Sequence, residues 1–343
     1  MKKTGLTLGK YAPLHRGHQY VIETAIKEMD EVIVIIYDTE VTRVPLTIRA
    51  GWIRRLYPSV KVIEAWDGPA GDDHDPVYEK AEEEYIKGLL NGITVTHFYC
   101  SEYYGEHVSR ALRAADRRVD EARQAVPVSA TMIRSDPYRY RHYMDSLVYR
   151  DMVIKAVFVG AMSTGKSTLT CALAKRYHTT YVSEYGRDYW TEHQVDRRIS
   201  LEAFDEICIG HIEREEEAYQ NADTYCFVDT NAITTYMFAM DYHGKAPKLL
   251  EQTALLNYKR YDLFFLCEDD IPYDDTWDRS GDQKRKVFHK QIIADLKERR
   301  IPYIPLAGTL EERMKKVDQV LSEFKTFDNY YGEKCRKMFH EIE

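Results

Sequence analysis

The sequence is poor in cysteine, and its cysteines do not cluster. Six of them are scattered through 343 residues without a CxxC pair, and most lie within apolar runs. A disulfide framework is therefore excluded, because such frameworks place many cysteines close together in a short secreted chain. The pattern predicts buried, free thiols in a reducing compartment, which favours a cytoplasmic location.

Long apolar runs and an excess of positive charge are also missing. No run approaches the roughly 20 apolar residues that a membrane span requires. The chain starts without the apolar core of a signal peptide, and we expect no membrane partner. The formal net charge is -8 and the pI is about 5.9, which argues against a nucleic-acid-binding surface as the main function.

What remains is the composition of an ordinary globular protein. Hydrophobic residues make up 44% of the chain and charged residues 30%, and no internal repeat or low-complexity segment is present. At roughly 150 residues per domain, this length predicts two domains with two separate cores.

The most informative stretch is residues 160–168 (GAMSTGKST), which fits the phosphate-binding loop pattern GxxxxGK[ST]. A buried parallel strand is predicted directly before it, over residues 154–159, and an amphipathic helix over residues 167–177. Glycine lets the backbone aim its N–H groups at phosphate, and a helix N-terminus adds the positive end of a dipole. The expected nucleotide contacts are Gly160, Ser163, Thr164, Gly165, Lys166, Ser167 and Thr168, with Lys166 at the β- and γ-phosphates and Ser167 at Mg²⁺.

Two carboxylates follow further strands that we predict in this half, over residues 180–183 and 224–228. Asp229 ends the buried strand and is the natural Mg²⁺ ligand of a phosphate-transfer site. Glu184 ends the strand after the phosphate-loop helix, where it could accept the proton of an acceptor hydroxyl. Asp188 is the second candidate for that role, and a helix-capping carboxylate is the structural alternative for Glu184.

Basic residues accompany these carboxylates. Arg187 lies one helical turn beyond Glu184 and is a candidate to bind substrate or phosphate. Arg279, Lys284 and Arg285 lie in and after a polar loop over residues 271–282, where they could close over a nucleotide as a lid. The alternative for this basic segment is ordinary solvated charge. Strands over residues 261–267 and 301–306 and helices over residues 201–221, 231–242, 283–299 and 310–324 complete the expected elements of this half.

The first half also alternates strands with helices, which predicts an α/β fold with a parallel sheet. The expected strands cover residues 4–10, 31–37, 60–65 and 95–100, and the expected helices cover residues 19–29, 48–56 and 78–90. The charge-rich segment over residues 110–123 is expected to be a solvated helix or loop.

Two histidines, His15 and His18, follow the first strand at the start of a helix. Three residues apart, they share one face of the first helical turn. Beside the helix dipole they could meet nucleotide phosphates and steady charge on a transferring α-phosphate. The alternatives are a metal-binding pair or two structural histidines. Gly9, Pro13 and Gly17 frame the pair.

That framing resembles the HxGH nucleotidylyltransferase superfamily, whose motif runs G-x-F/Y-x-P-x-H-x-G-H. By this resemblance Gly9, Lys10, Tyr11 and Gly17 join the histidines as nucleotide contacts. The second part of the signature corresponds to residues 128–134 (VSATMIR), in which Ser129 is a good N-cap, and Ser129, Thr131 and Arg134 would bind the departing phosphates. The implied reaction is attack of a substrate phosphate on the α-phosphorus of a nucleoside triphosphate, with release of pyrophosphate.

Over residues 4–324 the chain resembles the bifunctional nicotinamide-nucleotide adenylyltransferase / ribosylnicotinamide kinase (NadR) family. The resemblance rests on residues 9–18, 101–105 (SEYYG), 128–134, 160–168, 183–187 (SEYGR) and 228–230 (VDT). It implies a Rossmann-like HxGH domain over residues 1–150, a P-loop kinase domain over residues 151–325, both with mainly parallel sheets, and a tail over residues 326–343 without an assigned role. It also implies two steps to NAD, with ATP, Mg²⁺, nicotinamide riboside and nicotinamide mononucleotide as ligands.

Several points stay open at this stage. The first half could use another phosphorylated acceptor, such as a polyol or pantetheine, or the whole chain could be a nucleotide-responsive regulatory protein. Candidates to stack on the nicotinamide ring are Trp52, Tyr104 and Trp190. Some family members repress transcription through an N-terminal helix-turn-helix; this chain begins at the first strand, so we expect no DNA-binding role. A homo-oligomer is an open possibility.

Overall fold

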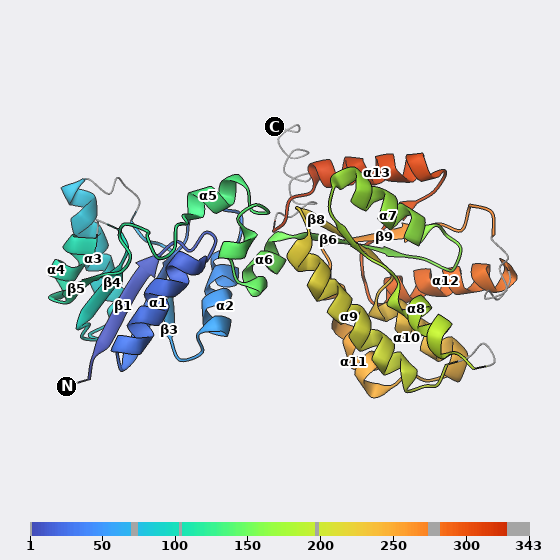
Figure 1. The fold of residues 1–343 in the computed structure, drawn as a ribbon, viewed down its shortest axis with the longest axis horizontal. Helices are drawn as coiled ribbons and strands as arrows, with labels where there is room; N and C mark the ends of the chain where they lie inside the picture. The colour runs from blue at the N-terminus through green and yellow to red at the C-terminus, as the bar shows by residue number, and fades with distance from the viewer. Residues whose placement is uncertain (1, 70–74, 103–104, 196–198, 274–281, 328–343) are drawn as a thin grey trace, which may run out of the picture. The chain divides into compact units, whose positions relative to one another are not determined.

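The computed structural model describes residues 2–69, 75–102, 105–195, 199–273 and 282–327. Two compact units divide the chain at Tyr149 and Arg150, and each contains its own five-stranded sheet flanked by helices (Figure 1). Every strand pairing in both sheets is parallel, so the expected α/β class with parallel sheets is confirmed.

The sheet of the first unit has the strand order β3-β2-β1-β4-β5. Its strands are β1 (Thr4–Gly9), β2 (Glu31–Tyr37), β3 (Lys61–Ala65), β4 (His97–Cys100) and β5 (Ala115–Arg118). The helices are α1 (Arg16–Glu28), α2 (Leu46–Leu56), α3 (Pro76–Leu90), α4 (Gly105–Leu112), α5 (Ala130–Ser135), the short helix η1 (Arg141–Tyr143) and α6 (Ser146–Met152), which crosses the boundary. Central strands β1 and β2 are buried along most of their length because helices cover both faces of a parallel sheet.

The expectation that residues 110–123 form only a solvated helix or loop is wrong. This segment contains β5, which pairs with β4 in the register His97 to Ala115 through Cys100 to Arg118. Three of its four residues are exposed, because an edge strand has a neighbour on one side only. Charged side chains are common on edge strands, where they discourage pairing with other chains, so the apolar pattern that reveals an inner strand is missing here.

The sheet of the second unit has the strand order β10-β9-β6-β8-β7. Its strands are β6 (Ile154–Val159), β7 (Thr180–Val182), β8 (Tyr225–Asp229), β9 (Leu263–Cys267) and β10 (Ile304–Leu306). The helices are α7 (Lys166–Tyr177), α8 (Tyr185–His193), α9 (Ala203–Asn221), α10 (Ala232–His243), α11 (Lys248–Leu256), η2 (Asn257–Arg260), α12 (Asp282–Glu298) and α13 (Leu310–Glu323). The sequence analysis did not anticipate α11.

Strand β6 is the centre of the second core. All six of its residues are buried, and the Phe158 ring stacks on Phe265 of β9 with a centroid separation of 5.2 Å. Phe227 of β8 approaches Phe158 from the other side at 6.2 Å. Aromatic pairs of this kind stabilise a core by about 0.5–1.5 kcal/mol beyond the area they bury. The strand that leads into the phosphate loop is therefore fixed on both sides.

The topology brings together the loops that carry the predicted chemistry. In each sheet the central strand, β1 or β6, lies between neighbours on both sides, and all strands run the same way. The carboxyl ends of the strands consequently share one edge, and sheets of this kind bind ligands at that edge, where the chain order reverses. The loops after β1 and β6 occupy that position.

Two class-level predictions concern cysteine and membranes. All the cysteines in the described part of the chain are free, and Cys100, Cys208, Cys226 and Cys267 are buried while Cys171 is partly exposed, so the prediction of mostly buried free thiols is confirmed for them. No helix within the described ranges has the length and apolar character needed to span a membrane.

Candidate active sites

The first candidate site lies where β1 leads into α1. His15 is the N-cap of α1, and its Nδ1 accepts hydrogen bonds from the backbone N–H groups of Gly17 at 3.1 Å and His18 at 3.4 Å. The two imidazole rings stack with centroids 3.7 Å apart. A Cβ at Gly17 would lie only 3.1 Å from the His15 ring, so glycine allows this close packing. The motif thus builds one ordered histidine pair at a helix N-terminus.

The surroundings keep both histidines neutral. Burial, together with the positive charges of Arg123 and Arg134, lowers the pKa of His15 to about 4. Burial, then the neighbouring His15 and Arg123, holds the pKa of His18 well below its ordinary value. In the free protein at neutral pH the pair therefore presents neutral rings, and the permanent positive charge close to it comes from arginine.

The second motif of this unit packs against the first. Ser129 caps α5, with its Oγ accepting from the Met132 N–H at 3.2 Å, as the sequence predicted. Arg134 donates to the carbonyl of Ala12 at 2.7 Å and to the Thr131 hydroxyl at 3.0 Å. The guanidinium of Arg134 therefore links the second motif to the histidine motif, through a contact between residues 122 positions apart in the chain.

Arg123 is exposed, as the sequence analysis expected, and it forms an ion pair with Glu102 at 3.3 Å, but its position near the histidines was not predicted. A turn organised by Asp120 holds it: the Arg123 N–H donates to the Asp120 carbonyl at 2.8 Å, and the Asp120 carboxylate accepts from the N–H groups of Ala125 and Val126, both at 2.9 Å. Its charge acts on both histidines. The Asp-x-x-Arg sequence before the second motif could have indicated this turn and the position of Arg123.

Arg49 of α2 is a second residue that sequence reasoning missed. Its side chain is fully buried, and it donates to the carbonyls of Val44 at 3.0 Å, Tyr37 at 2.9 Å and Lys10. It thereby ties the loop after β1 to the end of β2. Nothing in the local sequence pattern announces such a bond, because its acceptors come from three separate segments.

The other predicted residues of this unit fall in different places. Tyr11 is buried and packs edge-on against His18 with centroids 4.9 Å apart, while Lys10 is exposed and Gly9 ends β1. Trp52 is fully buried in α2, and its stacking on a ligand stays a prediction. Tyr104 lies outside the described residues.

The second candidate site is the loop between β6 and α7. Gly160 has a φ of 145°, and a Cβ there would lie 2.7 Å from the Cys267 carbonyl oxygen, so no other residue fits. Gly165, with a φ of 81°, is the N-cap of α7. The Thr164 hydroxyl and the Lys166 ammonium both donate to the Ala161 carbonyl, at 2.8 and 2.9 Å.

The remaining residues of this loop line its surface. Ser167 and Ser163 are half-buried and Thr168 is exposed, at the N-terminal end of α7. The positive end of the helix dipole and the loop's backbone N–H groups form an anion site of the expected kind.

Two acidic side chains meet beside the phosphate loop. Asp229 ends β8 opposite Phe158 of β6 and is 1% exposed, and its Oδ2 has no hydrogen-bond partner among the described residues. Glu184 occupies the N-cap position of α8 but makes no capping hydrogen bond, so the helix-capping alternative does not describe it. Burial and then the Asp229 carboxylate raise the pKa of Glu184, against the opposing charges of Lys166 and Arg187. Glu184 is partly buried, with its side chain 19% exposed. A partly buried carboxylate whose pKa is raised can serve as a proton acceptor.

Two further predicted residues of α8 form ion pairs. Arg187 binds Glu184, with its Nη2 at 3.2 Å from Oε2, while its side chain stays 48% exposed. Asp188 binds Arg214 of α9, with an N–O distance of 2.6 Å, and Arg214 also donates to the Ser183 hydroxyl at 3.0 Å. Trp190 is half-buried on the same helix.

The three basic residues predicted to form a lid, Arg279, Lys284 and Arg285, differ in their environments. Arg285 of α12 is buried and donates to the carbonyls of Ile271 at 3.0 Å and Ser163 at 3.4 Å, so solvated charge does not describe it. Lys284 is exposed. Arg279 lies outside the described residues, so its place in a lid stays a prediction.

Arg313 of α13 supports the phosphate loop and was not predicted. It is buried and donates to the Thr164 carbonyl at 2.6 Å and to the Gly308 carbonyl at 3.0 Å. The sequence contains no signal for it, because it lies in a charge-rich amphipathic helix most of whose other charges are exposed.

Comparison with known proteins adds three findings. A family model described as an AAA domain matches residues 155–313. The trifunctional NAD biosynthesis/regulator proteins NadR of Salmonella typhimurium and Escherichia coli are each 29% identical to this chain, over 327 and 330 residues, which is 88% of this chain and 78% of each relative. A crystal structure of a NadR protein in complex with NAD and AMP-PNP is similar with a TM-score of 0.54 at 22% identity, covering 93% of this chain and 95% of that one, and this likeness shows a common fold.

Proposed function

We propose that this homologue of the NadR proteins makes NAD in two steps. The second unit phosphorylates the 5'-hydroxyl of nicotinamide riboside with ATP, and the first unit transfers the adenylyl group of a second ATP to the resulting mononucleotide, releasing pyrophosphate. One observation carries the proposal: one chain, similar to NadR over 88% of its length, holds both a histidine pair at a helix N-terminus and a phosphate loop beside the carboxylates of Glu184 and Asp229. A NadR crystal structure with NR is a further neighbour, with a TM-score of 0.53 at 22% identity.

The kinase half fits a magnesium nucleotide. We assign Mg²⁺ to Ser167 and Asp229, because the buried Oδ2 of Asp229 has no other partner in the described structure and carboxylate and hydroxyl oxygens are ligands that Mg²⁺ prefers. When bound, the ion neutralises charge on the transferring phosphates. The loop N–H groups would hold the β-phosphate, and Lys166 would exchange its bond to the Ala161 carbonyl for phosphate oxygens.

Glu184 is assigned as the base of this half. It would accept the proton of the riboside 5'-hydroxyl as that oxygen attacks the γ-phosphorus, and its raised pKa brings its basicity closer to the working pH. Arg187, bound to Glu184 and half exposed, would contact substrate or phosphate. Asp188, in its pair with Arg214, would position this end of α8 or bind the riboside.

This assignment predicts an acid limit on the kinase reaction. Since the folded-state pKa of Glu184 is raised, the residue becomes protonated, and inactive as a base, at a pH above that of an ordinary glutamate. The value of kcat/KM for nicotinamide riboside should therefore fall as pH drops through this raised pKa. Glu184→Gln should lower kcat by roughly 10²-fold or more.

Glu192→Gln, on the exposed face of the same helix, is the control and should keep the wild-type rate and pH profile. A Glu184→Gln enzyme with full kcat and an unchanged acid limb would remove Glu184 from the base role.

The adenylyltransferase half works by positioning. The neutral His15 and His18 would donate N–H groups to oxygens of the α-phosphate, with Gly9, Lys10, Tyr11 and Gly17 forming the rest of this wall. Arg134, with the hydroxyls of Ser129 and Thr131 at the start of α5, would bind the departing pyrophosphate. The mononucleotide phosphate attacks the α-phosphorus directly, so no covalent enzyme intermediate is needed.

The decisive experiment is product formation by the wild-type chain from nicotinamide riboside and Mg·ATP. We expect NAD, with the mononucleotide as a transient intermediate, followed by chromatography. Accumulation of the mononucleotide alone would mean that the first half is inactive or serves another acceptor. If the riboside is not phosphorylated, the assignment of the kinase half is wrong. The free thiols of the described cysteines agree with the reducing cytoplasm that we propose as the setting.

A further inference from the structure

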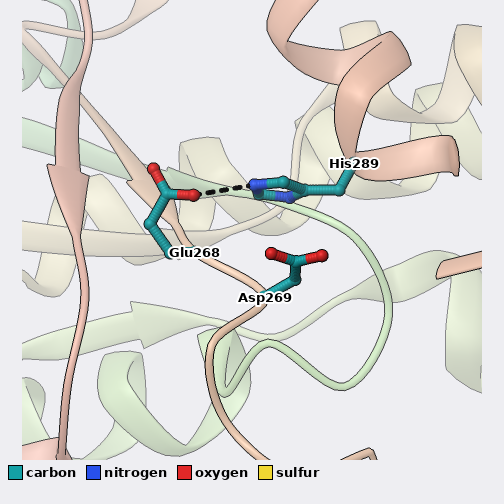
Figure 2. Close-up of side chains that lie close together, drawn as sticks. All are labelled: Glu268, Asp269 and His289. Atoms are coloured by element: carbon teal, nitrogen blue, oxygen red, sulfur yellow. Dashed lines mark hydrogen bonds and ion pairs between the residues drawn. The ribbon is translucent and has the colours of Figure 1, made fainter. Parts of the chain in front are cut away.

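A second group of potential ligands lies on the other side of the phosphate loop from Asp229. Glu268 and Asp269 directly follow β9, and His289 lies on α12 (Figure 2). One ligand atom from each of the three residues lies within 4.8 Å of the others. In the strand order, β9 and β8 flank β6 on opposite sides, so the strands that precede this group and Asp229 lie two strand spacings, about 10 Å, apart.

His289 is directed into this group by the burial of its helix. The buried positions of α12 follow one face, and they are Arg285, Phe288, His289, Ile292 and Leu296. His289 is 3% exposed, and its Nε2 lies 3.0 Å from Oε2 of Glu268. Its other ring nitrogen, Nδ1, is buried and has no hydrogen-bond partner among the described residues.

The unpartnered nitrogen is the observation that points to a ligand. With a proton on Nε2 shared with Glu268, Nδ1 presents a bare lone pair in a buried position, which is costly. Figure 2 shows the ring standing over the Asp269 carboxylate, which is itself an acceptor. Two acceptors facing each other are stabilised by a cation between them.

The neighbouring arginines do not supply that cation. Arg313 donates to the backbone carbonyl of Glu268 and pairs with Asp270, and Arg285 donates to the backbone carbonyl of Asp269. Within the described ranges, no lysine or arginine forms an ion pair with the carboxylate of Glu268 or Asp269. The two carboxylates can therefore balance the charge of one divalent ion.

We propose that Glu268, Asp269 and His289 bind a first-row divalent transition-metal ion, such as Zn²⁺ or Mn²⁺, at a site separate from the magnesium nucleotide. One imidazole and two carboxylates suit these ions, whereas Mg²⁺ prefers oxygen ligands alone. The ion joins the loop after β9 to α12. Because α12 also carries Arg285, which contacts the Ser163 carbonyl, the ion fixes the helix that supports the phosphate loop.

The test titrates the full, nucleotide-free chain with Co²⁺, whose visible absorption reports its ligands, and then displaces Co²⁺ with Zn²⁺. We expect one equivalent to bind. His289→Gln and Asp269→Asn should each weaken this binding by at least about 10-fold, since even residues that only support a metal ligand cost that much. Asp229→Asn and the exposed Glu298→Gln on the same helix should keep it.

Thermal melts without metal separate binding from folding. Asp269 is half-exposed, so Asp269→Asn provides a folded variant even if the buried His289→Gln is unstable. Absence of a saturable Co²⁺ band, or a band that survives Asp269→Asn in the folded protein, would overturn the proposal. If no saturable Co²⁺ band is seen, the group is better described as a protonated His289 between two carboxylates.

Discussion

Lys166→Ala is expected to lower kcat for phosphorylation of nicotinamide riboside by on the order of 10³-fold. This corresponds to a loss of about 4 kcal/mol of transition-state stabilisation. Lys166 is 7% exposed, and its ammonium lies inside the phosphate loop, on the Ala161 carbonyl. Residues 160–168 contain no other lysine that could replace its charge at the β- and γ-phosphates. The measurement is initial-rate formation of the mononucleotide.

The same variant should still make NAD when it is given the mononucleotide, because the histidine pair belongs to the other unit. Lys175→Ala is the matched control: Lys175 is an exposed lysine on the same helix and should keep the kinase rate. A Lys166→Ala enzyme that phosphorylates the riboside within a few-fold of wild type would contradict the role assigned to the loop.

His18→Ala is expected to have the opposite selectivity. The variant should phosphorylate the riboside at the wild-type rate but stop at the mononucleotide, with NAD formation reduced by roughly 10²- to 10³-fold. The physical reason is loss of a fixed N–H donor at the α-phosphate, held in place by stacking on His15 at 3.7 Å and by edge contact with Tyr11 at 4.9 Å.

The pH dependence of the adenylyl transfer shows whether the histidines act as neutral N–H donors or as charged imidazolium groups. Because the pKa of His15 is about 4 and that of His18 is held well below its ordinary value, both rings are neutral in the free protein at neutral pH. The kcat/KM for ATP should therefore show no histidine inflection between about pH 6 and 7, where an ordinary imidazole titrates. The exposed His142→Ala serves as the control and should change neither rate. An inflection near pH 6.5 that disappears in His18→Ala would show that the charged ring is the active form.

Local motifs predicted much of both candidate sites. The buried strand over residues 154–159 matches β6 to the residue, and the Ser129 cap and the helix after the phosphate loop were also predicted correctly. In each case the signal is short-range, since the period of apolar residues, a capping hydroxyl and glycines with positive φ all act within a few residues of the chain. Such features can be recognised without knowing the fold.

Features that depend on contacts between distant segments could not be predicted. Arg49 and Arg313 resemble solvent-exposed arginines in the sequence, yet both are buried and donate to carbonyls of other segments. Arg123 is exposed, but its charge acts on a histidine of another segment. The complete burial of Trp52 is likewise set by the packing of its helix against the rest of the unit and could not be predicted from its local sequence. The edge strand β5 lacks an apolar pattern because only one of its sides is paired.

The two arginines behind the phosphate loop have a consequence for its hydrogen-bonding groups. In a planar trans peptide the C=O and the following N–H point in opposite directions. Arg285 binds the Ser163 carbonyl and Arg313 binds the Thr164 carbonyl, so these two peptide planes are fixed and the N–H groups of Thr164 and Gly165 are turned the other way, away from the guanidinium groups. An arriving phosphate would meet donors that are already oriented, and little conformational entropy would be lost when it binds.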